Sequence, residues 1–142
     1  MTIHQLSIFI ENRPGTLIKV LNALKDANIQ IIASTIADTA EYGILRIVCA
    51  EPLRACEELK KAGIAVAISD VFALQLYNKP GCAADVIKLF SEAGISITYI
   101  YTFLLAGKGI LVFRTDNTEL ARKTIAENNL TFIAEDALTQ WP

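Results

Sequence analysis

The chain has 142 residues, of which 53% are hydrophobic and 20% charged, a composition that excludes disorder and favours self-association to cover apolar surface. Thirteen Lys and Arg against fifteen Asp and Glu give a formal net charge of -2 without any basic block, so nucleic acid is not an expected partner. No apolar stretch reaches the roughly 18 residues of a spanning helix, and the N-terminus enters strand-like sequence without a leader, so we expect a cytoplasmic protein with no membrane role.

The first copy of a repeated pattern starts with alternating apolar residues at Leu6, Ile8 and Ile10, which predict a strand that ends before Pro14. Apolar residues at three- and four-residue spacing then predict an amphipathic helix that contains Leu17, Val20, Leu21, Leu24 and Ala27. The remaining elements are the two strands of a hairpin, a second helix and a last strand, expected at 30–36, 44–49, 52–63 and 65–69, with a hairpin turn at 38–43.

The second copy follows at a constant offset of 66 residues. The offset places Asn12-Arg13-Pro14-Gly15 on Asn78-Lys79-Pro80-Gly81, Ala27-Asn28-Ile29-Gln30-Ile31 on Ala93-Gly94-Ile95-Ser96-Ile97, and Gly43-Ile44-Leu45 on Gly109-Ile110-Leu111. Because one register holds through turn, helix and strand positions, we infer two copies of one unit, with domains at residues 1–70 and 71–142. No Gly, Ser or Pro spacer separates them, which predicts packing without a flexible linker.

Both copies therefore read as βαββαβ. The elements expected in the second copy are a strand at 71–77, a turn at Pro80-Gly81, a helix with Val86, Ile87, Phe90 and Ala93, a hairpin across 96–115, a helix capped around 116–118 and a strand near 130–135. Such a unit closes into an antiparallel sheet with its helices on one face. The predicted fold class is α+β, with two tandem ferredoxin-like βαββαβ units.

The helices cover only one face of each predicted sheet, so the apolar residues on the other face must pack against something else. The row of apolar residues expected on one side of a strand in the second copy is Ile97, Tyr99, Tyr101 and Phe103, with Ile100 and Leu104 on the other side. Neither side resembles a surface that faces water, so one side is expected against the helices and the other against a partner sheet. The aromatic row is interpreted as core or interface packing, with a wall for ligand stacking as the alternative.

Residue types that perform catalysis or bind metals are scarce. Cys49, Cys56 and Cys82 are odd in number and lack CxxC spacing, and His4 is the only histidine. We therefore expect buried thiols, no metal site and no cofactor. The sequence contains no Ser-His-Asp, Cys-His or clustered carboxylate arrangement, so no catalytic residue is assigned and an enzyme is not expected.

Two rival classes share this fold, because fold alone does not determine function. An acylphosphatase-like hydrolase would need an anion loop such as Arg13 with Asn12, but the second copy has Lys79 in place of Arg13. An RNA-recognition module would use the aromatic run at 99–103, but few basic residues surround that run and the chain is acidic overall. Both classes are disfavoured.

The turn at 12–17 and the helix-to-strand passage at 27–31 resemble the ACT domain family of amino-acid-sensing regulatory modules, and the resemblance covers nearly the whole chain, twice. Family members usually read close to Arg-Pro-Gly-x-Leu in the turn and Gly-Ile-Asn-Ile in the passage. The second copy keeps Pro80 and Gly81. The departures from the family pattern are Lys79, Ala83, Gln30 and Ser96, in place of Arg, Leu, Asn and Asn.

The physical chemistry of the turn agrees with this resemblance. A helix that begins after Gly15 leaves the first amides, Thr16 and Leu17, without intrahelical partners at the positive end of the helix dipole, where a carboxylate can bind. Gly15 permits close approach of a ligand, and Asn12 either stabilises the turn or bonds the ligand. The predicted ligand-binding residues are Asn12, Arg13, Pro14, Gly15, Thr16, Leu17, Gln30, Ile31, Asn78, Gly81, Cys82, Ala83 and Ser96.

The resemblance implies that a free amino acid binds between the turn of one unit and the second strand of a neighbouring unit. Such binding would allosterically favour one arrangement of the units by its differential affinity. The expected partners are this small-molecule ligand, a second copy in a homodimer and a metabolic enzyme. The alternative function is a structural docking domain that regulates a separate metabolic enzyme without binding a small ligand.

Overall fold

The computed structural model describes residues 1–38 and 41–139, which form two compact units. The first unit is His4–Ser69, and the second unit combines Met1–Ile3 with the chain from Asp70 onward. The boundary falls inside a strand, β4, so no linker separates the two units. The elements are β1 (Thr2–Glu11), α1 (Thr16–Asp26), β2 (Ile31–Asp38), β3 (Tyr42–Cys49), α2 (Pro52–Lys61), β4 (Val66–Leu76), α3 (Cys82–Glu92), β5 (Ile97–Leu105), β6 (Lys108–Thr115), α4 (Thr118–Glu127) and α5 (Glu135–Thr139).

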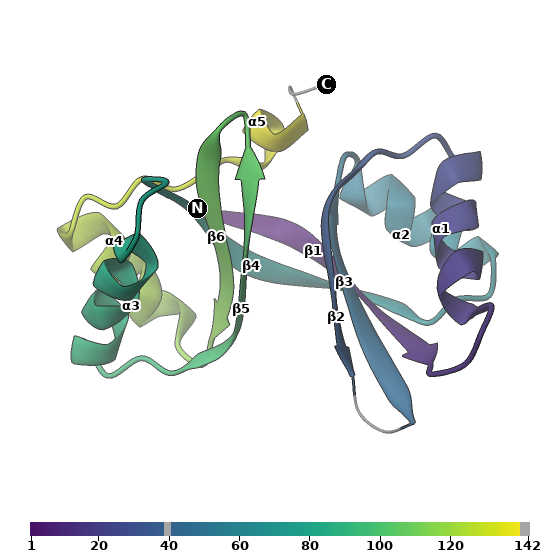
Figure 1. Ribbon diagram of the computed structural model, residues 1–142, viewed down its shortest axis with the longest axis horizontal. Helices are drawn as coiled ribbons and strands as arrows, with labels where there is room; N and C mark the ends of the chain where they lie inside the picture. Colours follow the sequence, from purple (N-terminus) through teal and green to yellow (C-terminus); the bar gives the residue numbers. More distant parts are fainter. Residues whose placement is uncertain (39–40, 140–142) are drawn as a thin grey trace. The chain divides into compact units, whose positions relative to one another are not determined.

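The first unit has the strand order β2-β3-β1-β4, in which β3 pairs antiparallel with both β1 and β2. Helices α1 and α2 lie on one side of these strands (Figure 1). The alternating residues of β1 point toward them, so Leu6 and Ile8 are 0% exposed and pack with Leu24 of α1 and Leu59 of α2. The turn at 38–43 was predicted between β2 and β3, and residues 39–40 lie outside the described part of the chain.

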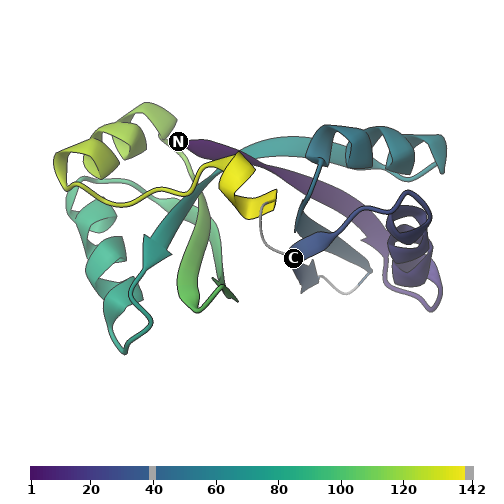
Figure 2. The same cartoon turned by 90° about the horizontal axis from the view of Figure 1, so that it is seen from above.

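The second unit repeats this arrangement with the order β4-β6-β5, and α3 and α4 on one side of the strands (Figure 2). Phe72 and Phe113 stack in its core with ring centroids 5.3 Å apart, and Phe90 of α3 packs 4.9 Å from Phe113. The Asn117 side chain caps α4 by accepting a 3.0 Å hydrogen bond from the Leu120 amide, as the sequence predicted. The predicted fold class, with two βαββαβ units, is confirmed.

The last strand of the second unit is much shorter than predicted. Only Phe132 of the expected strand near 130–135 forms a bridge, opposite Leu74. Two main-chain hydrogen bonds of 2.8 Å flank it, from Gln75 to Thr131 and from Ile133 to Ala73. The prediction was wrong beyond this point, because Glu135 and Asp136 place two carboxylates in the first turn of the short helix α5, where the helix dipole favours negative charge.

The two units carry a β-bulge at equivalent positions, between Ile31 and Ala33 and between Ile97 and Tyr99. The expected single row is therefore wrong for Ile97 and confirmed for Tyr99, Tyr101 and Phe103, which pair with Arg114, Val112 and Ile110 of β6. Ile97 packs into the core under the helices, whereas Tyr101 and Phe103 pair with Val112 and Ile110, which lie on the opposite face from Leu111 and Phe113. An extra residue in the strand reverses the alternation of side chains after Ile97.

Among residues 1–38 and 41–139, no helix is long and apolar enough to cross a membrane.

Candidate functional site

The first predicted turn joins β1 to α1 through a left-handed glycine. Gly15 has φ +92°, a backbone conformation in which any residue with a Cβ atom is strained. The Thr16 hydroxyl lies 2.7 Å from the Glu11 carbonyl and 3.0 Å from that of Arg13, and the Thr16 amide donates to Arg13 at 3.5 Å. The Thr16 amide is thus already used within the turn, and the Leu17 amide follows it in the first helical turn, where no preceding carbonyl of the helix is available.

The second predicted turn has the same backbone with different side chains. Gly81 has φ +87° and precedes Cys82, which replaces Thr16 and is buried at the start of α3. The Lys79 amide donates to the Tyr77 carbonyl at 2.9 Å, as Arg13 donates to Glu11 at 2.8 Å in the first turn.

The side chains that flank each turn also differ. Arg13 forms an exposed 2.8 Å ion pair with Glu11, whereas the Lys79 ammonium lies 5.6 Å from the centroid of the Tyr77 ring. The main-chain scaffold of the turn is thus duplicated, and its chemical surroundings are not.

The predicted second-strand residues lie far from the turn of their own unit. Gln30 and Ile31 follow the C-terminal end of α1, and Asn12 precedes its N-terminal end, so the 11 residues of the helix, about 16 Å, separate them. Gln30 and Ile31 line a separate pocket of about 540 Å³ with Leu21, Leu24, Lys25, Asn28 and Ile29. Ser96 lies at the corresponding end of α3, where its main chain is bonded to Thr115 and Asp116.

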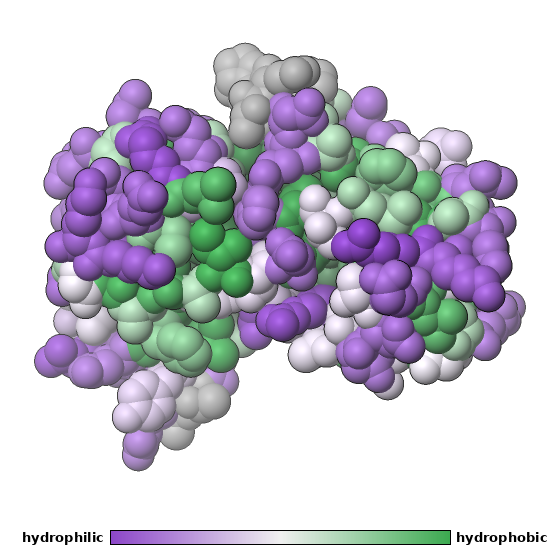
Figure 3. All heavy atoms as spheres, turned by 180° about the vertical axis from the view of Figure 1, so that it is seen from behind, coloured by the Kyte–Doolittle hydropathy of each residue, from purple (hydrophilic) through white to green (hydrophobic). Residues whose placement is uncertain are grey.

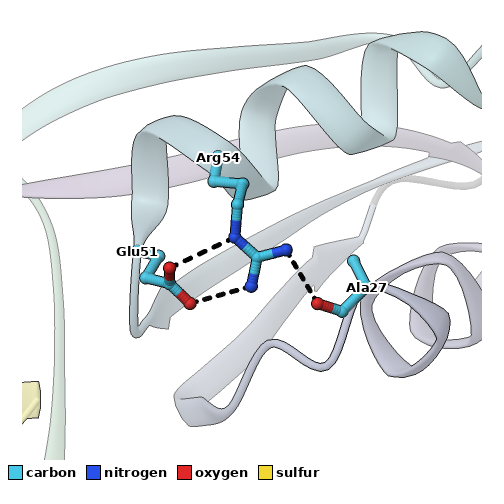
Figure 4. Close-up of polar contacts among 3 residues, drawn as sticks. All are labelled: Ala27, Glu51 and Arg54. Atoms are coloured by element: carbon cyan, nitrogen blue, oxygen red, sulfur yellow. Dashed lines mark hydrogen bonds and ion pairs between the residues drawn. The ribbon is translucent and has the colours of Figure 1, made fainter.

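Arg54 and Glu51 form a polar cluster near Gln30, just before the start of β2. The guanidinium of Arg54 in α2 donates 2.8 Å hydrogen bonds to the carbonyl of Ala27 and to the carboxylate of Glu51 (Figure 4). Hydrogen bonds from Arg54, followed by its positive charge, lower the pKa of Glu51, and the same hydrogen bonding raises the pKa of Arg54. The Ala50 amide donates to the Gln30 carbonyl at 2.9 Å, so the main chain at Gln30 is fixed while its side chain is exposed.

The second turn opens into a pocket of about 400 Å³, which we call the second-turn pocket. Four predicted residues line it: Asn78, Gly81, Cys82 and Ala83. Lys79 of the turn also lines it, as does Phe103, which the sequence offered only as part of a possible stacking wall. The sequence did not indicate the other lining residues, which are Tyr77 of the turn and, at the ends of β4, β5 and β6, Leu76, Thr102, Leu104, Gly109 and Ile110. The volume lies within the range of small-molecule sites. Among the described lining residues, Lys79 carries the only formal charge.

The first turn borders a different hollow, which we call the first-turn hollow. Its described lining is Glu11, Asn12, Arg13, Glu41 and Tyr42, with a volume of about 430 Å³. Two carboxylates against one guanidinium make this lining net negative. Arg13 and Thr16 also line a smaller pocket of about 260 Å³, whereas Pro14, Gly15 and Leu17 line none of these described pockets.

An inner strand of each unit carries an equivalent glycine, Gly43 in β3 and Gly109 in β6. The side chains packed over these two glycines differ, and this difference helps to explain why the pockets differ. A Cβ built on Gly43 would lie 3.2 Å from Cγ1 of Ile10 and 3.4 Å from Cγ2 of Ile36, so these isoleucines already cover that glycine. At Gly109, the equivalent position, the nearest atoms all belong to Leu76, and no side-chain atom of Thr102, which replaces Ile36, is among them. Gly43 is buried, whereas Gly109 is partly exposed and lines the second-turn pocket.

Large apolar side chains are exposed near both turns. Phe9 is 60% exposed, Tyr77 79% and Leu104 63%. Figure 3 shows hydrophobic residues at the surface among hydrophilic ones on the face that it presents. Within residues 1–38 and 41–139, no three His, Cys, Asp or Glu side chains are grouped closely enough to bind a metal ion.

Comparison with known proteins gives structures that are similar over nearly the whole chain. The crystal structure of protein BT0572 from Bacteroides thetaiotaomicron is 34% identical, with a TM-score of 0.92 over 99% of this chain and 97% of that chain. Regulatory subunits of aspartate kinase share the fold. The Thermus thermophilus subunit is 16% identical, with a TM-score of 0.61 over 87% of this chain and 91% of that one, and the Thermus flavus subunit is 17% identical, with a TM-score of 0.57 over 87% and 90%.

No curated protein sequence matches the chain significantly. Residues 1–141 match the family described as an ACT domain pair, which agrees with the duplicated βαββαβ units and the repeated Pro-Gly turn. The chain belongs to the ACT domain pair family.

Proposed function

We propose that the protein is a regulatory, non-catalytic module whose ACT domains, residues 1–70 and 71–142, bind a free amino acid at one or both Pro-Gly turns. The observation that carries this proposal is the second-turn pocket, in which four predicted ligand-binding residues meet at the start of a helix. The helix offers amide donors to a carboxylate, and Gly81 lets the ligand approach the main chain.

The role of the second-strand residues follows from their distance to the turn. Because α1 separates Gln30 from Asn12 within one unit, a ligand contacts both only if a neighbouring ACT unit supplies one of them. We propose that Gln30, Ile31 or Ser96 of such a neighbour provides the second polar contact, and that the chain acts as a homodimer in the cytoplasm. Ligand binding then shifts the arrangement of units, and any metabolic enzyme bound to them, by its differential affinity.

Calorimetry of the full chain against the twenty amino acids tests the proposal, which requires saturable binding of at least one of them. Asn12→Ala and Asn78→Ala each remove an exposed amide beside a turn. Loss of a hydrogen bond to a charged ligand group weakens binding about 10- to 150-fold, so at least one variant must show that loss. Asn22→Ala, at an exposed position in the middle of α1, is the matched control and should bind normally.

A docking module without a small ligand is the second candidate, and the exposed Phe9, Tyr77 and Leu104 favour it. If no amino acid binds while the purified chain forms a stoichiometric complex with a metabolic enzyme, this candidate replaces the first. Normal affinity in both asparagine variants would instead place the binding site away from the turns.

A further inference from the structure

We propose that the second turn is the one that binds, and that its pocket selects an amino acid with an uncharged, apolar side chain. This inference rests on the proposed function and narrows it to one ligand per chain and one chemical class. It reverses the ranking suggested by sequence, in which the first turn matches the family pattern more closely.

The charge around each turn separates the two sites. A bound carboxylate at the first turn would meet the carboxylates of Glu11 and Glu41, and Arg13 is already paired with Glu11 at 2.8 Å. In the second-turn pocket Lys79 is the only charged residue of the described lining, and it lies over a neutral ring. A ligand carboxylate is therefore attracted to the second turn and repelled by the carboxylates at the first.

The space at the strand ends also separates the two sites. In the first unit, Ile10 and Ile36 lie within 3.5 Å of the Cβ position of Gly43 and fill the place where a ligand side chain would enter. In the second unit, Thr102 replaces Ile36, and the space above Gly109 belongs to a pocket of about 400 Å³. The second turn therefore has room for a ligand side chain above its strand glycine, whereas the hollow of about 430 Å³ at the first turn does not include Gly43 in its described lining.

The lining of the second-turn pocket defines the ligand class. Leu76, Phe103, Leu104 and Ile110 surround the space, and no described lining residue is acidic. A basic ligand side chain would have no counter-ion there, and an acidic one would lose its hydration against apolar walls. An aliphatic side chain carries no charge that needs a counter-ion or hydration, and its burial in the pocket is favourable. The amide oxygen of Asn78 and the hydroxyl of Thr102 are the lining groups suited to accept hydrogen bonds from the ligand ammonium.

The position after Cys82 gives a sharp test, because the two units differ there. The residue is Ala83 in the second unit and Leu17 in the first, so Ala83→Leu inserts a side chain that the same backbone already carries. Ala83 lines the pocket and is exposed, so the substitution should fill the pocket and leave the fold intact. Ala84→Leu, at the next exposed position on α3 and outside the described lining, is the matched control.

Calorimetry with L-leucine should give one site per chain, with no saturable binding of L-aspartate or L-lysine. Ala83→Leu should weaken L-leucine binding about 5- to 150-fold, and Ala84→Leu should bind as the parent does. Isoamylamine, which is leucine without its carboxylate, should not bind. In amide-resolved NMR spectra, the residues that shift on titration should be 81–85 and Gly109, with 15–19 unchanged.

Several results would overturn this inference and leave the proposed function standing. They are tight binding of a charged amino acid, two sites per chain, equal affinity in Ala83→Leu and the parent, or amide shifts at 15–19 in place of 81–85. If none of the twenty amino acids binds, both proposals fail together. Thermal melts of Ala83→Leu and Ala84→Leu show whether either variant is misfolded, and the NMR map of the unmodified chain tests the site without any substitution.

Discussion

The pair Gly43→Ala and Gly109→Ala tests whether the two units differ in the space above the middle strand. Both glycines have backbone angles outside the left-handed region, so alanine causes no main-chain strain at either position. Replacing Gly by Ala stabilises a compatible site by about 0.4–1 kcal/mol, because the unfolded chain loses conformational freedom. The two variants therefore share this gain and differ only in what the new methyl group meets.

At Gly109 the nearest neighbours of the new methyl are Cβ and the carbonyl oxygen of Leu76, both at 3.4 Å, which is ordinary contact. At Gly43 the methyl lies 3.2 Å from Cγ1 of Ile10, and the stiff β-branched side chain has to shift. Overpacking of this kind costs about 1–3 kcal/mol. We expect Gly109→Ala to be more stable than the parent and Gly43→Ala to be less stable, with a difference between the variants of roughly 1–3 kcal/mol.

Thermal unfolding measures this difference directly. A change of 1 kcal/mol shifts Tm by roughly 2–4 °C in a chain of this size, so the two variants should melt roughly 2–12 °C apart. Chemical unfolding should give the same order at an unchanged m-value. Equal melting temperatures would refute the reasoning, because they would mean that Ile10 and Ile36 leave as much room above Gly43 as Leu76 leaves above Gly109.

Three further predictions concern stability. Phe90→Ala removes a side chain that is 0% exposed and should cost about 3–5 kcal/mol in denaturant unfolding; a cost below about 1 kcal/mol would contradict its place in the core. Because Arg54 lowers the pKa of Glu51, the stabilisation by Glu51 is complete above the ordinary carboxyl pKa of 4.5 and is lost as pH falls through the lowered pKa, so the difference in Tm between the parent and Glu51→Gln should shrink on acidification and not stay constant. Asn117→Ala removes the cap on α4 and should cost about 0.5–2 kcal/mol, whereas Asn117→Asp should retain most of that stability in the same thermal melts.

The repeated turns were predictable because their chemistry is local. Proline and glycine fix the backbone at Pro14-Gly15 and Pro80-Gly81, and the period of the apolar residues after them identifies α1 and α3. The bulges were not predictable in the same way. Ile31 and Ile97 look like the first members of an alternating row, and only the pairing of each strand with its neighbour shows the extra residue.

The pocket residues outside the turn were missed for a related reason. Gly43 and Gly109 were visible as a repeated pair, but the sequence did not show what lies above each glycine. That depends on cross-strand register, which places Leu76 and Leu104 opposite Gly109. Part of this arrangement could have been predicted. The repeat predicts a hairpin in each unit, and its register pairs Leu104 with Gly109 close to the second turn.

The second unit is discontinuous along the chain, since Met1–Ile3 belong with the residues from Asp70 onward and Ile3 is 1% exposed. During synthesis on the ribosome, His4–Ser69 can fold as soon as it has emerged, whereas the first three residues can join their unit only after residues beyond Ser69 have been translated. The contacts between Met1–Ile3 and the rest of the second unit join residues that are far apart in sequence, and such contacts slow folding. A tag fused to Met1 would therefore disturb the second unit, which carries the second-turn pocket. It would spare the first unit, His4–Ser69, although that unit follows the tag more closely in sequence.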